Sequence, residues 1–180
     1  MIVRDFAEAD LASVTAIYAE SVLNGTGTFE LDVPTLEQMK ARLDLPVSLG
    51  LPVLVAEIEG QVAGYAYAGP YRLRAAYRYL VEDSIYVGSD YRGRGVGLKL
   101  LNALLGACEA KGMRQVVAVI GDSNNAGSIG LHRAAGFEHV GVFHAAGWKF
   151  DDWRDVVFMQ KALGAGRTTA PDADGLDCGR

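Results

Sequence analysis

Six residues in the middle of the chain decide the fold: Arg92, Gly93, Arg94, Gly95, Val96 and Gly97. A predicted strand at residues 80–87 leads into this run, and a predicted helix follows it to about residue 111. Small residues let backbone N–H groups converge on an anion, and the N-terminus of the helix adds partial positive charge. Together with the two arginines, this pattern predicts a binding site for a diphosphate.

Two better-known phosphate loops do not match this run. The spacing G-x-G-x-G differs from the dinucleotide fingerprint G-x-G-x-x-G, and no acidic residue closes a following strand. A nucleotide-binding Walker loop needs Gly-Lys-Ser or Gly-Lys-Thr, which is absent. By spacing alone, a glycine-rich turn with two solvated arginines stays open as the alternative.

Composition limits the class of protein. The 180 residues suit one domain, and the formal charge of −5 argues against a nucleic-acid binder. No apolar run reaches the roughly 18 residues of a membrane span, and the N-terminus does not resemble a signal peptide. Cys108 and Cys178 are far apart, so neither a disulfide framework nor a metal site is predicted. We expect a cytoplasmic protein without membrane or nucleic-acid partners.

Hydrophobic periodicity predicts an α+β fold with a mostly antiparallel sheet and helices on its faces. Helices are expected from residue 11, from Thr35 to Pro46 at the latest, after the loop that starts at residue 93, and over 125–135. Strands are expected at 2–5, 53–58, 62–68, 80–87, 116–120, 140–145 and 156–159. Residues 164–180 have little to bury and are predicted to be a disordered tail after a domain of residues 1–163.

The strand end and loop at residues 85–97 resemble the acetyl-CoA motif of the GNAT N-acetyltransferases, Q/R-x-x-G-x-G/A. Residues 125–137 resemble the GNAT helix beside the pantetheine arm of the cofactor. Blocks at 66–71, 82–87, 116–121 and 145–150, with Trp153, Asp155 and Val156 after the last, are similar to the phosphinothricin and methionine sulfoximine N-acetyltransferases. The resemblance spans about residues 2–163. It implies a twisted GNAT sheet with a V-shaped split between the fourth and fifth strands.

The resemblance implies acetyl-CoA as co-substrate and no metal. The backbone of Tyr86 and Val87 is expected to bond the pantetheine, and the N–H groups from Gly93 to Leu98 to hold the pyrophosphate. Asn125 and Ser128 are expected on the cofactor side. Asn125 also suits the N-cap of its own helix, and the two roles are compatible.

Amine acetylation needs a neutral amine and a proton for the departing thiolate. Glu82 matches the position of a proposed family base, with Asp83 as the competing carboxylate. His132 stands where many GNAT enzymes have a tyrosine acid. It can donate to the sulfur, assist deprotonation, bond Glu82 through water or simply pack in the protein.

The stretch 70–79 mixes aromatic and basic residues. Arg72 and Arg74 can bind an anionic acceptor with bidentate geometry, or they are solvated arginines of a surface loop. Tyr77, Phe29, Tyr67 and Val119 are assigned to the same acceptor pocket. Trp148 and Trp153 are interpreted as core or dimer-interface aromatics, and because many relatives are dimers we expect a homodimer.

The predicted function is transfer of acetyl to the α-amine of a small amino-acid-like acceptor through a ternary complex. One alternative is the same chemistry on a polyamine, an aminoglycoside or a protein N-terminus. Another is a non-catalytic acyl-CoA-binding regulatory module, which needs the loop at 92–97 but neither Glu82 nor His132.

Overall fold

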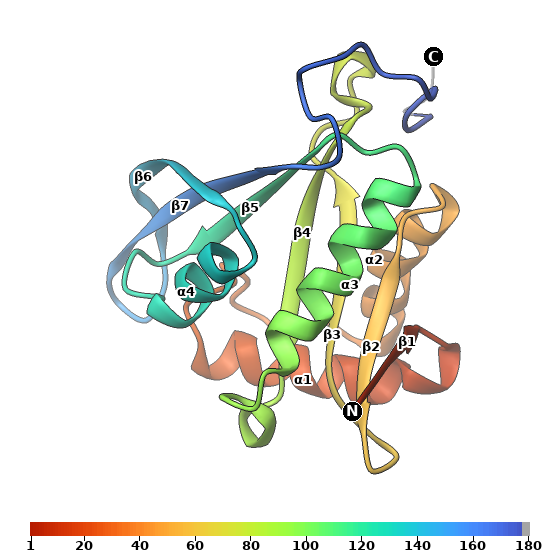
Figure 1. Ribbon diagram of the computed structural model, residues 1–180. Coiled ribbons are helices and arrows are strands. Elements are labelled where there is room, and N and C mark those ends of the chain that lie inside the picture. Colours follow the sequence, from red (N-terminus) through yellow and green to blue (C-terminus); the bar gives the residue numbers. More distant parts are fainter. Residues whose placement is uncertain (178–180) are drawn as a thin grey trace.

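The computed structural model describes residues 1–177, which form one seven-stranded sheet with helices on both faces (Figure 1). The strand order is β1-β2-β3-β4-β5-β7-β6, and all neighbours are antiparallel except the parallel pair β4–β5. The strands are β1 (Ile2–Asp5), β2 (Val53–Ile58), β3 (Gln61–Pro70), β4 (Leu80–Val87), β5 (Gln115–Gly121), β6 (Glu138–Trp148) and β7 (Trp153–Ala162). The predicted α+β class, with a mostly antiparallel sheet and helices on its faces, is confirmed.

Residues 1–177 contain four α-helices: α1 (Leu11–Asn24), α2 (Leu36–Ser48), α3 (Val96–Ala110) and α4 (Ala126–Ala134). The connections in this range contain the short 3-10 turns η1 (Glu8–Asp10), η2 (Ala75–Tyr77) and η3 (Ser89–Tyr91). One core cluster joins α3 to the sheet, and a second joins α1 and α2 to the opposite face. The side chains of β4 alternate between these two clusters, which determines where its carboxylates lie.

The sequence predicts that the second helix ends at Pro46 at the latest, and this is wrong, because the helix continues through Pro46 to Ser48. Thr35 starts this helix with a capping box, since its hydroxyl accepts from the Gln38 N–H and the Gln38 side chain accepts from the Thr35 N–H. Pro46 lies in the last turn, where its missing N–H removes one hydrogen bond, and the Leu49 N–H still bonds the Leu45 carbonyl. The buried Pro46 ring adds to the core.

The last two strands are longer than their apolar patterns indicate. β6 is the edge strand, and most of its residues are exposed, so its ends carry polar residues and glycine. Register irregularities against β7 interrupt the alternation on which the prediction relies. Trp148 and Trp153 pair across the turn between the two strands.

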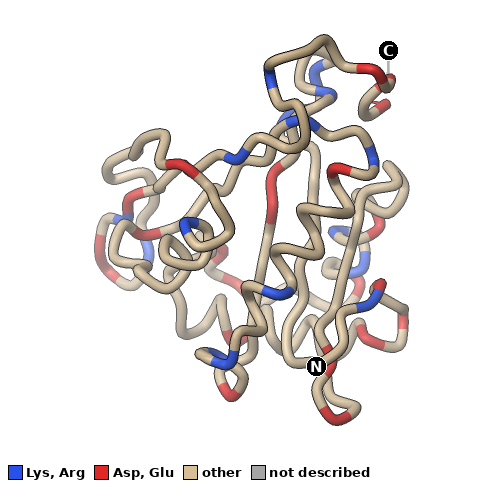
Figure 2. Tube along the Cα trace, in the orientation of Figure 1, with Lys and Arg blue, Asp and Glu red and all other residues tan. Residues whose placement is uncertain are grey.

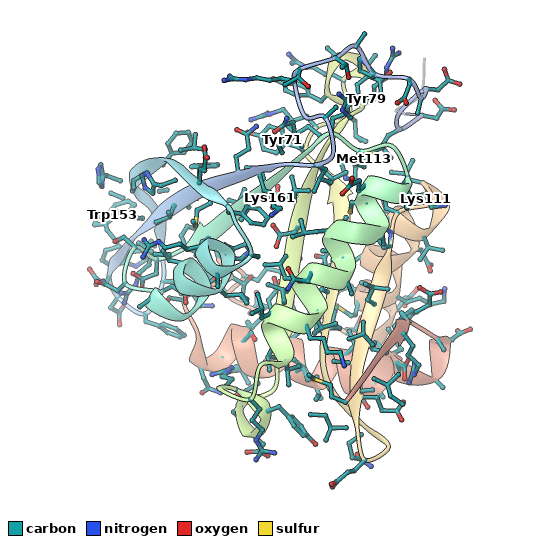
Figure 3. All side chains as sticks on the ribbon, in the orientation of Figure 1. Tyr71, Tyr79, Lys111, Met113, Trp153 and Lys161 are labelled. Carbon is teal, nitrogen blue, oxygen red and sulfur yellow. The ribbon has the colours of Figure 1, made fainter. Side chains whose placement is uncertain are left out.

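Residues 164–177 contain no helix or strand and lie beside the loop at 71–79 (Figure 1). The Leu176 N–H bonds the Arg78 carbonyl at 2.8 Å, and the Tyr79 hydroxyl bonds the Ala173 carbonyl at 2.8 Å. Basic residues gather at this end of the molecule (Figure 2), and Tyr71 and Tyr79 lie there as well (Figure 3). The disorder predicted for 164–180 stays a prediction, and Cys178 lies outside the described residues.

Candidate active site

A split in the sheet forms the largest feature of the site. The parallel pairing of β4 with β5 runs from Leu80 opposite Gln115 to Asp83 opposite Ala118 and stops there. Beyond this apex, β4 stays paired with β3, and β5 stays paired with β7. The two strands therefore diverge, and a cleft of about 970 Å³ lies between their ends, the starts of α3 and α4, and the loop after α1.

The glycine-rich run turns the chain from β4 into α3. Gly93 and Gly95 have φ values of +72° and +77°, a left-handed conformation that side chains with a Cβ rarely adopt. Gly95 is the N-cap of α3, and no side chain caps this end. The first N–H groups of α3 therefore have no intrahelical partner and remain available for an anion in the cleft.

The two arginines of the run differ in position. Arg92 lines the cleft, where its Nε donates to the Val87 carbonyl at 3.2 Å and its guanidinium lies 3.4 Å from Glu20. Arg94 does not line the cleft, and its guanidinium lies 5.7 Å from the centre of the Tyr91 ring. The other predicted pyrophosphate residues do line the cleft: Gly93, Gly95, Val96, Gly97 and Leu98.

Polar backbone and side-chain groups continue the cleft from the loop toward the apex. Tyr86, Val87, Asn125 and Ser128 all line it. The edge of β4 beyond Asp83 has no strand partner on the β5 side, so its backbone groups face the split. Asn125 caps α4, since its Oδ1 accepts from the Ser128 N–H at 3.1 Å. The predicted cap is confirmed, and the predicted contact with pantetheine stays a prediction.

The adjacent carboxylates at the apex point to opposite faces of the sheet. Glu82 lies on the α1–α2 face, is partly exposed and lines the cleft. It forms no hydrogen bond or ion pair with any of residues 1–177. Burial raises the pKa of the Glu82 carboxyl, and the charge of Asp83 raises it further. Glu82 is therefore the uncommitted carboxylate of the pair.

His132 bonds Asp83 and not Glu82. Its Nε2 lies 2.9 Å from Oδ2 of Asp83, and its Nδ1 lies 2.8 Å from the Ser128 carbonyl oxygen. Both side chains are almost fully buried on the α3–α4 face. Burial alone lowers the pKa of His132, but the hydrogen bond and charge of Asp83 outweigh it and raise the pKa. A water-mediated bond to Glu82 is thus not needed to explain the position of His132.

We expect Glu82→Gln to raise the melting temperature at pH 7 and to leave it unchanged at pH 4. The Glu82 pKa is raised above its ordinary value of 4.5 in the folded state. The folded state therefore binds this proton more tightly, and stability falls as pH rises from 4.5 through the raised pKa. Thermal melts of wild type and variant at both pH values check this, and equal melting temperatures at pH 7 would contradict it.

The residues assigned to the acceptor pocket fall into two groups. Phe29 and Val119 line the cleft, and Tyr67 lies beside it, bonded to Ser84, which also lines the cleft. The other three are exposed and do not line it: Arg72, Arg74 and Tyr77. Arg72 lies over the Tyr71 ring at 5.3 Å, and Tyr77 contacts the edge of the same ring.

The loop after α1 contributes to the site, and only its last residue, Phe29, is assigned to the site from the sequence. Residues 24–29 line the cleft, and Lys149 holds this loop because its Nζ donates to the Thr28 carbonyl at 2.9 Å. Lys149 is 2% exposed, and burial lowers its pKa. The Phe29 ring packs on Gly147, where an added Cβ would lie 2.4 Å from it. This close packing fixes Phe29 at the wall of the cleft.

Comparison with known proteins identifies the family to which this architecture belongs. Residues 25–137 match the acetyltransferase (GNAT) family. The chain is a GNAT acetyltransferase. The matched region runs from the loop after α1 through the glycine-rich run to the end of α4, so it contains the whole split.

Individual GNAT relatives match over nearly the full chain. A phosphinothricin N-acetyltransferase of Alcaligenes faecalis is 48% identical over 94% of this chain and 86% of the relative. An L-methionine sulfoximine/L-methionine sulfone acetyltransferase of Pseudomonas paraeruginosa is 42% identical over 89% of this chain and 94% of the relative. The crystal structure of a phosphinothricin acetyltransferase from Sinorhizobium meliloti with acetyl-CoA superposes with a TM-score of 0.93 at 48% identity. The superposition covers 97% of this chain and 94% of that structure.

The residues present fit acetyl-CoA. The glycine cradle, formed by Gly93 and Gly95 at the start of α3, can hold the diphosphate. Arg92 and the N–H groups without a helical partner lie beside it and can bind its oxygens. The open edge of β4 can form backbone hydrogen bonds with the pantetheine arm, as it would with a neighbouring strand. Among residues 1–177, no three His, Cys, Asp or Glu side chains gather into a group that can hold a metal ion.

Proposed function

We propose that this GNAT enzyme acetylates the α-amine of a small amino-acid-like acceptor of the phosphinothricin, methionine sulfoximine or methionine sulfone type. The identity of 48% and 42% to enzymes with these acceptors in their names, over about nine-tenths of the chain, supports the acceptor class. The observation that carries the chemistry is Glu82, an unpaired carboxylate at the apex of the split.

Glu82 is proposed as the base. An acceptor amine is an ammonium at neutral pH, so it must lose a proton before its nitrogen lone pair can attack. Glu82 accepts this proton directly or through one water, and its raised pKa makes the carboxylate a better base than an exposed one. Acetyl-CoA supplies the thioester. The new C–N bond forms as the C–S bond breaks, and the sulfur leaves with the electron pair as a thiolate. The nitrogen then loses its second proton, which passes to the thiolate directly or through water, so the products are the neutral amide and coenzyme A thiol.

Direct transfer is proposed because no residue in the cleft can carry the acetyl group as a thioester. Cys108 is the only cysteine among residues 1–177, and it is fully buried on α3. Burial raises the pKa of its thiol to about 12, so the reactive thiolate is absent at neutral pH. Amine and acetyl-CoA therefore occupy the enzyme together.

The acceptor pocket is proposed to begin at Phe29, Tyr67 and Val119, close to Glu82. Arg72, Arg74 and Tyr77 stay predictions for binding of the acceptor's anionic group. They lie on an exposed loop that follows β3, the strand paired with β4 at Glu82. A carboxylate or phosphinate suits arginine, whereas a polyamine would need acidic groups in these positions.

A homodimer is proposed on the exposed apolar surface of the β6–β7 hairpin. Trp153 projects from this surface at the outer edge of the molecule (Figure 3). The surface consists of five apolar residues that are at least half exposed: Val140, Phe143, Trp148, Phe150 and Trp153. Trp148 and Trp153 are therefore not core residues, which was one of the two interpretations of the sequence. Large apolar patches on a surface indicate an interface.

We expect Trp153→Glu to convert the dimer to a monomer, because a charge in the centre of an apolar interface is costly. Sedimentation velocity at micromolar protein checks this. Tyr77→Glu is the matched control, since Tyr77 is an exposed aromatic outside this surface and should leave the dimer intact. A wild-type monomer at all concentrations would contradict the proposal.

Location in the cytoplasm is also proposed, since bacterial relatives of this kind share the family and the fold. Within residues 1–177, no helix is both long enough and apolar enough to cross a membrane.

A thiol-release assay with a panel of amines tests the proposed function. Methionine sulfone and phosphinothricin represent the proposed class, and putrescine, an aminoglycoside and an alanine-terminated peptide represent the alternatives. We expect saturable coenzyme A release with the first two and little with the others. Release only with the peptide or the polyamine would overturn the acceptor class and keep the chemistry.

A further inference from the structure

We infer that Asp83 is a positioning residue that holds His132 as a fixed imidazolium at the apex of the split. Three observations carry this inference: the partners of the two ring nitrogens, the place of the pair in the sheet, and an unpaired oxygen of Asp83. The inference rests on the proposed use of the split for acetyl transfer.

The partners of the ring determine its protonation. Nδ1 lies 2.8 Å from the Ser128 carbonyl oxygen, which only accepts, so Nδ1 carries a proton. Nε2 lies 2.9 Å from a carboxylate oxygen of Asp83, so a second proton lies between these two atoms. An ordinary histidine holds a proton more tightly than an ordinary aspartate. The ring is therefore an imidazolium, and Asp83 is its counter-charge.

The pair joins two elements that the split would otherwise leave apart. Asp83 is the last residue of β4 that pairs with β5, opposite Ala118. His132 lies on α4, which follows β5 on the other arm of the split. The ring also packs edge-on against Phe137, with 5.0 Å between ring centroids. The ion pair thus connects both arms where they meet.

Asp83 has a second oxygen that contributes nothing to this connection. Its Oδ1 is buried without a hydrogen-bond partner among residues 1–177, and both Asp83 and His132 line the cleft. An unpaired buried carboxylate oxygen costs stability. This cost indicates that Asp83 has a role in the active site in addition to any role in stability.

The geometry also argues against His132 as the direct proton donor to the sulfur. Both N–H groups are already used inside the protein, so donation to the sulfur would break a buried hydrogen bond. His132 then acts by holding α4 and its cofactor-side residues in place. Glu82 and Cys108 are titratable groups near the pair, and the charge of Asp83 raises the pKa of each of them.

Titration of His132 by NMR, with ¹⁵N-labelled protein, tests the protonation without turnover. We expect both ring nitrogens of wild type to be protonated at pH 7. In Asp83→Asn, the pKa of His132 should fall by about 1–3, because an opposite charge at this distance shifts a pKa by about that amount. A wild-type His132 that is neutral at pH 7 would overturn the inference, and this result needs no variant to fold.

Kinetics test the positioning role. We expect Asp83→Asn and His132→Gln each to lower kcat by up to about 100-fold through misplacement, and the double variant to lose no more than either alone. Asp83→Asn should also move the acid limb of the rate profile to lower pH, because it removes a charge that raises the Glu82 pKa. Asp90→Asn, an exposed carboxylate of η3, is the matched control and should change neither.

The outcomes separate this inference from the proposed function. If His132→Gln loses far more activity than Asp83→Asn and the losses multiply in the double variant, His132 is a direct acid and the inference fails. If wild type acetylates no amine but His132 is an imidazolium, the proposed function fails and the charge state stands.

Discussion

Glu82→Gln will lower kcat for acetylation by about 10²–10⁴-fold, the usual contribution of a general base. Glutamine keeps the size and polarity of the side chain but cannot take the proton of the acceptor ammonium. Affinity for acetyl-CoA should stay unchanged, because Glu82 lies at the apex of the split and away from the glycine cradle at the start of α3. Steady-state kinetics and acetyl-CoA binding by calorimetry check the two halves of this expectation.

The pH profile distinguishes a base from a structural carboxylate. The wild-type rate should rise as Glu82 ionises, above its ordinary pKa of 4.5 because burial raises the pKa. This limb should disappear in Glu82→Gln. Glu138→Gln, an exposed carboxylate at the start of β6, is the control and should keep both rate and profile. A Glu82→Gln variant with wild-type kcat would show that water or the bound ligand removes the proton.

Gly97→Asp will abolish tight acetyl-CoA binding without unfolding the protein. Gly97 lies in the first turn of α3 and lines the cleft. An added Cβ would lie 3.2 Å from Cδ2 of Leu131, the flexible end of a side chain that can shift. An acidic residue in the first turn of a helix stabilises the helix, but here it repels the bound diphosphate. Two like charges 4 Å apart at the surface of a protein repel by about 4 kcal/mol, so we expect affinity to fall by about 10²–10³-fold.

The same helix supplies the control. Gly106→Asp places the same side chain on an exposed turn of α3 where an added Cβ meets nothing within 4 Å. It should bind acetyl-CoA as wild type does. Calorimetric titration of both variants gives the comparison, with circular dichroism to confirm that each is folded. Equal affinities for the two variants would mean that the diphosphate does not lie at the start of α3.

The parts of this site that follow from short-range patterns could be predicted from the sequence. Glycine spacing predicts the loop at residues 92–97, and apolar runs predict β4 and β5 on either side of it. Asn125 is recognisable as a cap because an asparagine before a helix accepts from its first turn. Family resemblance adds the split between the strands, and it suggests Glu82 as the base, a role that stays a prediction.

The contacts between distant elements could not be predicted. Asp83 and His132 are 49 positions apart, and their bond depends on β4 presenting alternate residues to α4. Lys149 holds Thr28 across 121 positions, and nothing in the composition of either segment indicates this contact. Arg72 and Arg74 show the opposite case. Their residue types suit an anionic acceptor, but the structure places them on an exposed loop.

We propose that this enzyme uses the split to transfer acetyl from acetyl-CoA to the amine of an amino-acid-like acceptor. The most direct measurement is coenzyme A release by wild type with methionine sulfone as acceptor, combined with mass spectrometry of the product. We predict a saturation curve and one N-acetylated product for each thiol released. Binding of acetyl-CoA without thiol release or acetylated product, for methionine sulfone and for every other amine of the panel, would contradict the account.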